Sequence, residues 1–254
     1  MIKSIVRFFH ALKVVRGIEI LNMPAPFKSR DKVAVHAYNE YITQRTHYAR
    51  KNDWPVNNVH FDLDDYDSIS DTRYLLVIKK IKNPGVKVLT GMRLTKVPKI
   101  QESLSFAMWD HAVEKEQFLR QINHHKSDID LINRSGKHHD LWDLTRLMTH
   151  TGLLDKKTWR DRSSTAAALL ALLGAGVGFC SKEAYWIFTC DYKIKRFLDR
   201  LGLDHTVLAH GKISKSDKGD NYLCYSKVRP SFDKLYKEKP FIFVVARAGH
   251  KRTA

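Results

Sequence analysis

The pattern of apolar and polar positions divides the chain into short strands and helices. Residues 34–51 (AVHAYNEYITQRTHYARK) predict a helix. Residues 73–80 (RYLLVIKK) and 87–95 (KVLTGMRLT) are rich in apolar and β-branched residues, which favour strands. The turn residues Asn83-Pro84-Gly85 separate the two segments, so we predict that they form an antiparallel hairpin.

The rest of the chain alternates between helical and strand patterns. After the hairpin the pattern predicts a helical segment at 101–135 and a histidine-rich loop at 124–139. It then predicts a strand at 141–149, a buried helix beginning at 165–173, a strand at 184–191 and an amphipathic helix at 192–203. Two further strands are predicted near 222–228 and 241–246. This order predicts an α/β fold with a mixed sheet flanked by helices. No repeat or linker divides the sequence, so we predict one domain over residues 1–254 with extensions at both ends.

The net charge is unusual for a chain of otherwise ordinary composition. Hydrophobic residues make up 43% and charged residues 28%, which excludes a disordered or fibrous protein. The 44 basic and 27 acidic side chains give a net charge of +17. Residues 1–51 hold ten basic and three acidic side chains, and residues 205–254 hold eleven and four, so each end carries +7. Basic ends around a near-neutral centre predict an acidic partner at the surface.

Cysteine usage and apolar runs restrict the cellular setting. The three cysteines are widely spaced and form no Cys-x-x-Cys, so we expect reduced, buried thiols and a cytoplasmic protein. The uncharged run 163–181 is only 19 residues long and holds three glycines, which favours a buried helix over a membrane span. Four basic residues interrupt residues 1–21, so this segment is no secretory signal. A basic helix there either lies against lipid or packs on its own domain.

Two conspicuous motifs are better explained by structure than by chemistry. Gly174, Gly176 and Gly178 follow a helix and precede a strand, whereas a phosphate-binding loop stands before a helix, so a helix C-cap is favoured. The histidine pairs at 124–125 and 138–139 show no metal-ligand spacing, and a solvated loop is favoured. We therefore predict no metal site.

Acidic residues gather in one segment of this basic chain. Five of ten residues there are carboxylates: Asp62, Asp64, Asp65, Asp67 and Asp71. Arg93 and Arg146 stand in apolar strands, where a buried guanidinium needs a carboxylate partner. Asp143 lies three residues before Arg146, so the two side chains point to opposite faces of a regular strand unless a bulge intervenes. The sequence therefore predicts a polar cluster of these arginines and carboxylates.

Several of these residues stand in the order of a known set of motifs. Tyr48 and Trp54 keep a six-residue step between aromatics, followed by Asp62-x-Asp64-x-x-Asp67, the strand Gly91-Met92-Arg93-Leu94, the strand Trp142-Asp143-Leu144-Thr145-Arg146, and the segment 196–212. In this order they resemble the acyl-homoserine lactone synthases, which make quorum-sensing autoinducers on a GNAT-like, acetyltransferase-like fold. The resemblance covers about residues 44–225 and implies a mostly antiparallel central sheet.

The resemblance implies an acyltransferase that forms an amide. In this family the amine of S-adenosylmethionine attacks an acyl thioester carried by acyl carrier protein, and the product closes to an N-acyl-homoserine lactone. A carboxylate serves as general base; Asp143 is the candidate, with Asp64 and Asp67 as alternatives or as partners of Arg93 and Arg146. Trp54 would cover the sulfonium or adenine, although a core tryptophan explains it equally well.

The remaining predicted contacts concern substrates and partners. The predicted substrate-binding residues are Tyr48, Trp54, Asp62, Phe106, Trp142 and Thr145. Core packing explains the apolar ones equally well. No cofactor is implied, since S-adenosylmethionine is a substrate, and the basic ends fit an acidic carrier protein. Two alternatives stay open: an N-acyl amino acid synthase that uses an ordinary amino acid, and a basic nucleic-acid-binding protein, although no nucleic-acid motif is present.

Overall fold

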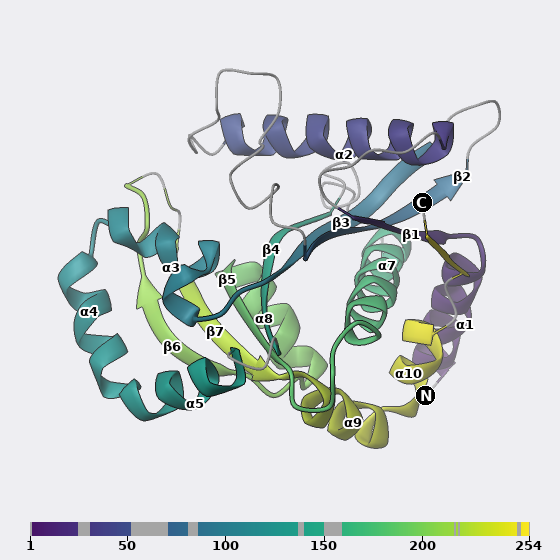
Figure 1. Cartoon of the computed structure of the whole chain (residues 1–254). Coiled ribbons are helices and arrows are strands. Elements are labelled where there is room, and N and C mark those ends of the chain that lie inside the picture. Colours follow the sequence, from purple (N-terminus) through teal and green to yellow (C-terminus); the bar gives the residue numbers. More distant parts are fainter. Residues whose placement is uncertain are drawn as a thin grey trace. The chain divides into compact units, whose positions relative to one another are not determined.

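The computed structural model describes residues 2–24, 31–51, 71–80, 86–136, 140–149, 159–215, 217, 219–247 and 250–253 (Figure 1). The chain folds into two compact units. The first unit comprises residues 1–93, 146–179 and 239–254, and the second comprises residues 94–145 and 180–238. Two strands, β3 and β4, have residues in both units. The prediction of a single acyltransferase domain stays a prediction.

The first unit is built on strands in the order β3-β2-β1-β8. Its elements are α1 (Ile2–Arg16), β1 (Glu19–Pro24), α2 (Lys32–Lys51), β2 (Thr72–Lys80), β3 (Val86–Lys96, to Arg93), the end of β4 (Leu141–Thr149, from Arg146), α7 (Trp159–Val177), α10 (Pro240–Arg247) and β8 (His250–Thr253). Strand β1 runs antiparallel to β2 and parallel to β8.

Alternate residues of β2 supply both faces of this sheet. Tyr74, Leu76 and Ile78 are buried in one cluster with Ala37 and Tyr41 of α2, together with Leu21, Met23, Ala34, Ile42, Val86, Val88 and Met148. The residues between them, Leu75 and Val77, are also fully buried and point to the opposite face, where α7 packs against β1 and β2. Figure 1 shows α2 and α7 on opposite faces of these strands. A strand buried on both faces explains the continuous apolar run of β2.

The second unit is built on strands in the order β6-β7-β5-β4. Its elements are the end of β3, two 3-10 turns, η2 (Ile100–Glu102) and η3 (Met108–His111), the helices α3 (Leu104–Ala107), α4 (Lys115–His124), α5 (Lys126–Gly136), α8 (Tyr192–Leu201) and α9 (Val228–Glu238), the start of β4, and the strands β5 (Tyr185–Asp191), β6 (Thr206–Gly211) and β7 (Asn221–Lys227). Strand β7 runs antiparallel to β5 and β6, whereas β4 and β5 are parallel.

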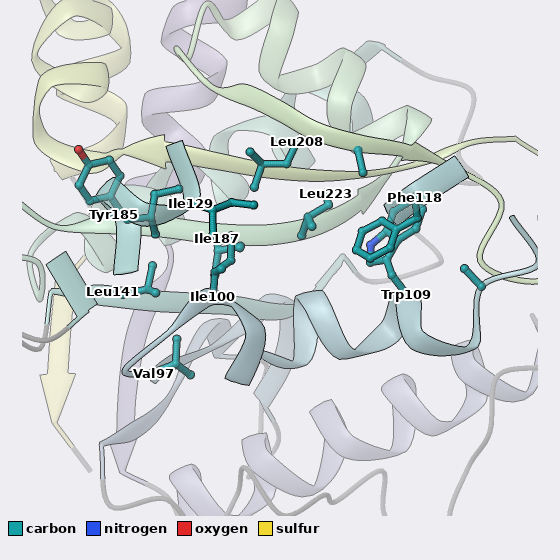
Figure 2. Packing of buried hydrophobic residues seen from close by; sticks show 13 residues of the cluster. Val97, Ile100, Trp109, Phe118, Ile129, Leu141, Tyr185, Ile187, Leu208 and Leu223 are labelled. Atoms are coloured by element: carbon teal, nitrogen blue, oxygen red, sulfur yellow. The ribbon is translucent and has the colours of Figure 1, made fainter. Parts of the chain in front are cut away.

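One face of these strands carries the main core of the second unit. Figure 2 shows Ile187 and Leu223 of the sheet in the same cluster as Trp109 and Phe118 of the helical layer. The Trp109 and Phe118 rings stack with centroids 5.0 Å apart. On the other face Trp186 meets Phe232 of α9 edge to face, 5.6 Å between centroids. The sheet of this unit is therefore covered by helices on both sides.

The structure confirms the predicted fold class, a mixed and mostly antiparallel α/β sheet flanked by helices. The predicted strands β2, β3, β4, β5 and β7 and the predicted helices α2, α7 and α8 all occur. Helix α8 ends at Leu201 and is followed by a left-handed C-cap at Gly202, whose φ is 82°. The uncharged run after Arg162 lies mostly in the buried helix α7. Among the described residues, no helix combines the length and apolar character needed to cross a membrane.

Three predictions about elements were wrong. Residues 241–246 lie in helix α10, not in a strand, because Ile242, Val245 and Ala246 form a buried helical stripe. Residues 126–136, predicted as a loop, form helix α5, which buries Ile129 and Ile132 at helical spacing. Of the three glycines predicted at a helix C-cap, Gly174 and Gly176 lie inside α7, and only Gly178 directly follows its last residue, Val177. A Cβ on Gly174 would stand 2.7 Å from the carbonyl oxygen of Ala246, so this glycine permits close packing of α10.

Candidate functional site

Asp143, one of the predicted catalytic residues, is fully buried, as is Arg93. Asp143 lies on β4 in the second unit and has no exposed surface. Its Oδ1 accepts a hydrogen bond from Ser105 Oγ at 2.5 Å, and its Oδ2 accepts from the backbone N–H of Leu104 at 2.8 Å and of Ser105 at 3.3 Å. Donors from the start of α3 thus replace the water that a carboxylate would otherwise require. The carboxylate of Asp143 fixes α3 against β4.

Ser105 links Asp143 to the neighbouring strand β5. Its Oγ accepts the backbone N–H of Thr189 at 3.2 Å, and its carbonyl oxygen accepts the Thr189 hydroxyl at 2.7 Å. The Thr189 hydroxyl in turn accepts the indole N–H of Trp109 at 3.1 Å. The pairing of β4 with β5 includes Leu141, Trp142 and Asp143. Thr189 lies two residues beyond Ile187, which pairs with Asp143. The Thr189 amide of β5 therefore donates to a side chain of α3.

Arg146 stands where β4 departs from regular strand geometry. Its φ is 55°, the only positive φ of a non-glycine residue in the described part of the chain. The guanidinium Nη1 donates to Tyr74 Oη at 3.2 Å, and the carbonyl oxygen accepts from Tyr41 Oη at 2.7 Å. Asp143 and Arg146 are both buried. The sequence analysis left a β4 irregularity open, and the positive φ at Arg146 is such an irregularity.

One of the two tyrosines that contact Arg146, Tyr41, packs closely against a glycine of β3. The Tyr41 and Tyr74 rings meet edge to face with centroids 6.0 Å apart. A Cβ at Gly91 would lie 2.5 Å from Cε2 of Tyr41 and 2.6 Å from Cδ2 of Leu76. Only glycine therefore lets the Tyr41 ring lie this close to β3. Tyr41 and Tyr74 bridge α2, β2 and β4 within the first unit.

Arg93 lies on β3 and is among the largest fully buried side chains of the protein. Its neighbours Met92 and Leu94 are equally buried, so the guanidinium lies inside the protein. A buried guanidinium is stable only with hydrogen-bond acceptors around it, which is why the sequence pattern singled it out. In the same strand Thr90 donates its hydroxyl to the carbonyl oxygen of Met148 at 2.6 Å and ties β3 to β4.

The structure places the predicted substrate-binding residues in several elements. Trp142 is buried on β4, with the Lys96 ammonium 5.1 Å from its ring centroid, and Thr145 is buried on the same strand. Phe106 is half-buried on α3 and meets Phe118 edge to face at 5.3 Å. Tyr48 lies in α2. The predicted residues Trp54, Asp62, Asp64 and Asp67 lie outside the described residues, so the predicted contact of the acidic segment with the arginines stays a prediction.

The sequence analysis missed the residues that position the charged ones. Ser105 is 38 residues from Asp143, and Tyr41 and Tyr74 are 105 and 72 residues from Arg146. A hydroxyl in a helix or strand carries no local signal for so distant a partner. A weak signal existed at Ser105, because Ser103-x-Ser105 stands at a helix start, where Ser103 Oγ accepts the Phe106 N–H at 3.1 Å.

The cysteines have the character of core residues. Burial raises the pKa of the Cys180 thiol to about 11, although a hydrogen bond from Trp186 opposes the shift. A hydrogen bond with Cys224 and then burial raise the pKa of Cys190 well above its ordinary value. Nucleophilic cysteines have the opposite shift. Within the described residues, no group of three or more His, Cys, Asp or Glu side chains is arranged to hold a metal ion.

The fold is that of solved acyl-homoserine lactone synthases. The structure of the CoA-dependent acyl-homoserine lactone synthase BjaI, with SAM and isopentyl-CoA, matches with a TM-score of 0.56 and 14% identity over 94% of each chain. The CoA-dependent synthase MesI matches with 0.53 and 12% identity, and the AHL synthase LasI with 0.52 and 16%; each alignment covers 87% of this chain and 95% of the other. No protein-family model and no curated protein matches the sequence. The predicted resemblance is confirmed at the level of the fold.

Proposed function

We propose that this protein is an acyltransferase of the acyl-homoserine lactone synthase type. It transfers an acyl chain from a thioester to the amine of S-adenosylmethionine and closes the product to an N-acyl-homoserine lactone. The observation that carries the proposal is the fold match to BjaI over 94% of both chains. Independent support comes from Arg93, Asp143 and Arg146, which sequence motifs selected and which lie buried on β3 and β4.

The proposed reaction has two steps. In the first, the amine attacks the thioester carbonyl, a C–N bond forms, and the C–S bond breaks to release the thiol, which takes up a proton. In the second, the methionyl carboxylate attacks its own γ-carbon and the C–S⁺ bond breaks, so that methylthioadenosine leaves. The second step is intramolecular and depends mainly on positioning. The protein must therefore orient one substrate for both steps and accept one proton from the amine.

The proposal gives each charged residue a role. Arg93 and Arg146 orient the carboxylates of Asp62, Asp64 and Asp67 around the substrate, and one of Asp143, Asp64 or Asp67 takes up the amine proton. Arg146 is suited to a fixed role because tyrosines hold both its guanidinium and its carbonyl group. Trp54 covers the sulfonium through an aromatic face. The amides beside the irregular geometry at Arg146 stabilise the tetrahedral oxyanion.

The acyl donor is proposed to be acyl carrier protein. The two ends of the chain carry +14 together, a charge that suits an acidic protein docking at the surface. BjaI and MesI are described as CoA-dependent, which makes acyl-CoA the competing donor. The two donors present the same thioester, so only the part that docks at the surface differs. Turnover with acyl carrier protein should fall steeply as salt rises if docking is electrostatic.

The test is turnover by the purified protein. It is incubated with S-adenosylmethionine and either acyl-CoA or acyl carrier protein, and mass spectrometry follows N-acyl-homoserine lactone and methylthioadenosine. We expect both products in equal amounts, with the higher kcat/KM for acyl carrier protein. Acylation of an ordinary amino acid would move the protein to the N-acyl amino acid synthases. No product with either donor would contradict the proposal.

Paired variants connect the activity to the site. Arg146→Lys retains the charge but loses the planar fork that binds carboxylates, and we expect kcat/KM to fall by about a hundredfold or more. Arg120→Lys, the same exchange at an exposed position of α4, is the matched control and should leave kcat/KM unchanged. Circular dichroism and thermal melting verify that both variants fold. An Arg146→Lys variant with full activity would remove Arg146 from the proposed site.

A further inference from the structure

Helix α10 exposes apolar side chains opposite its buried stripe. Ile242, Val245 and Ala246 are buried in the first unit. On the opposite side Phe241 is 51% exposed and Val244 is 44% exposed. A helix that is apolar on all sides is normally buried on all sides. Its exposed half therefore has the composition of a contact surface.

The neighbouring helix α1 continues this surface. The two helices pack against each other within the first unit, and Figure 1 shows them side by side. Phe9 of α1 is 63% exposed and shares a helical face with the exposed Lys13 and Arg16, four and seven residues further on. On α10 the exposed Arg247 follows the apolar residues in the same way, with its guanidinium 5.1 Å from the Phe243 ring centroid. Each helix thus presents aromatic residues and then basic ones.

All charges on these two helices have one sign. Residues 2–16 and 240–247 hold Lys3, Arg7, Lys13, Arg16 and Arg247 and contain no Asp or Glu. We propose that this α1–α10 face, formed by Phe9, Lys13, Arg16, Phe241, Val244 and Arg247, binds the surface of an anionic phospholipid bilayer. The aromatic and aliphatic side chains enter the boundary between headgroups and acyl chains, and the basic side chains contact the phosphates.

Charge favours lipid over a second copy of the chain. A symmetric dimer through this face would bring two sets of basic side chains together, which is unfavourable. An anionic bilayer neutralises every basic residue at once and demands no matching shape. The face contains none of the proposed catalytic residues, and a vesicle assay contains no acyl carrier protein, for which the basic chain ends are the proposed docking surface. Its test therefore stands or falls separately from the proposed function.

The experiment is sedimentation of the full-length protein with vesicles. One set consists of phosphatidylcholine alone, and the other contains phosphatidylglycerol as well. We expect binding to the anionic vesicles only, weakened by high salt because exposed charges are screened. Phe241→Ser should lower the partition coefficient about fivefold through the lost apolar burial. Arg247→Gln should lower it about fivefold through the lost charge.

A control in the second unit makes the result specific. Tyr192 on α8 is also 51% exposed, and Tyr192→Ser should leave vesicle binding unchanged. Failure of the wild-type protein to bind anionic vesicles would overturn the proposal, as would an equal loss in Tyr192→Ser and Phe241→Ser. Light scattering that reveals a dimer abolished by Phe241→Ser, without vesicle binding, would assign the face to self-association instead. Binding of an acidic protein through Phe241 without vesicle binding would also overturn it.

Discussion

Replacing Asp143 by asparagine tests whether its carboxylate holds the second unit together. The substitution keeps the shape of the side chain but exchanges one acceptor oxygen for an NH₂ group. The native carboxylate accepts hydrogen bonds from Ser105 Oγ at 2.5 Å and from the amides of Leu104 and Ser105. The amide oxygen of asparagine can retain the partners of only one carboxylate oxygen. The NH₂ group must then face N–H or O–H donors, from which it cannot accept a hydrogen bond.

The expected loss follows from the kind of bond removed. A hydrogen bond to a charged group contributes about 1.5–3 kcal/mol, and a buried group left without a partner costs a similar amount. Part of this is offset because asparagine carries no charge to desolvate. We therefore expect Asp143→Asn to lower the free energy of unfolding by about 2 kcal/mol. For a chain of this size the melting temperature should fall by about 4–8 °C.

Urea unfolding followed by circular dichroism measures this difference. The matched control is Asp233→Asn, the same exchange at an exposed position of α9, which should change the free energy by less than about 0.5 kcal/mol. Ser105→Ala should be destabilising alone but add little to Asp143→Asn, because both remove the same bond. Equal stability of the two asparagine variants would refute the reasoning. A stable but inactive Asp143→Asn would instead favour its role as the base.

Two further predictions concern stability. Gly91→Ala should cost about 2 kcal/mol in urea unfolding because its methyl group would collide with Tyr41; Gly219→Ala, with open space around its Cβ, is the control, and equal stability of the two would contradict the packing argument. Because the pKa of Cys180 is raised in the folded state, the folded protein keeps the thiol proton at pH values where the unfolded protein has lost it. The contribution of Cys180 to the free energy of unfolding is therefore complete below about pH 9 and is lost between about pH 9 and 11. The melting temperature of the wild-type protein should therefore fall more steeply between about pH 9 and 11 than that of Cys180→Val. The same dependence of melting temperature on pH in both proteins would contradict this prediction.

The elements that the sequence predicted correctly have local signals. Strand β2 is a continuous run of buried apolar residues, and α8 has an Asp191 cap at its start and Gly202 at its end. Helix α10 was mistaken for a strand because PFIFVVAR is an apolar, β-branched run without a clear period. Its Pro240 at the first helical position was the signal that favoured a helix. Contact with α7 then decides the outcome, which no local pattern contains.

The sequence indicated that Arg93, Asp143 and Arg146 are buried, but it did not indicate which residues support them. Arg93, Asp143 and Arg146 were recognisable because a charge in an apolar strand is costly without partners. The partners themselves were not, since a tyrosine or serine in a core segment is as compatible with plain packing. Sequence spacing left two possibilities open: Asp143 and Arg146 point to opposite faces of β4, or β4 is irregular between them.

Arg146 shows why the geometry of this site belongs to the tertiary structure. A positive φ at a residue with a Cβ costs about 1–2 kcal/mol, and no glycine marks the position in the sequence. The cost is offset where Tyr41 donates to the Arg146 carbonyl oxygen at 2.7 Å and Tyr74 accepts from its guanidinium at 3.2 Å. Tyr41 reaches that position only because Gly91 leaves room for its ring. Residues on α2, β2 and β3 therefore jointly determine the backbone conformation of one residue on β4. The unusual φ is a property of their packing and not of the β4 sequence.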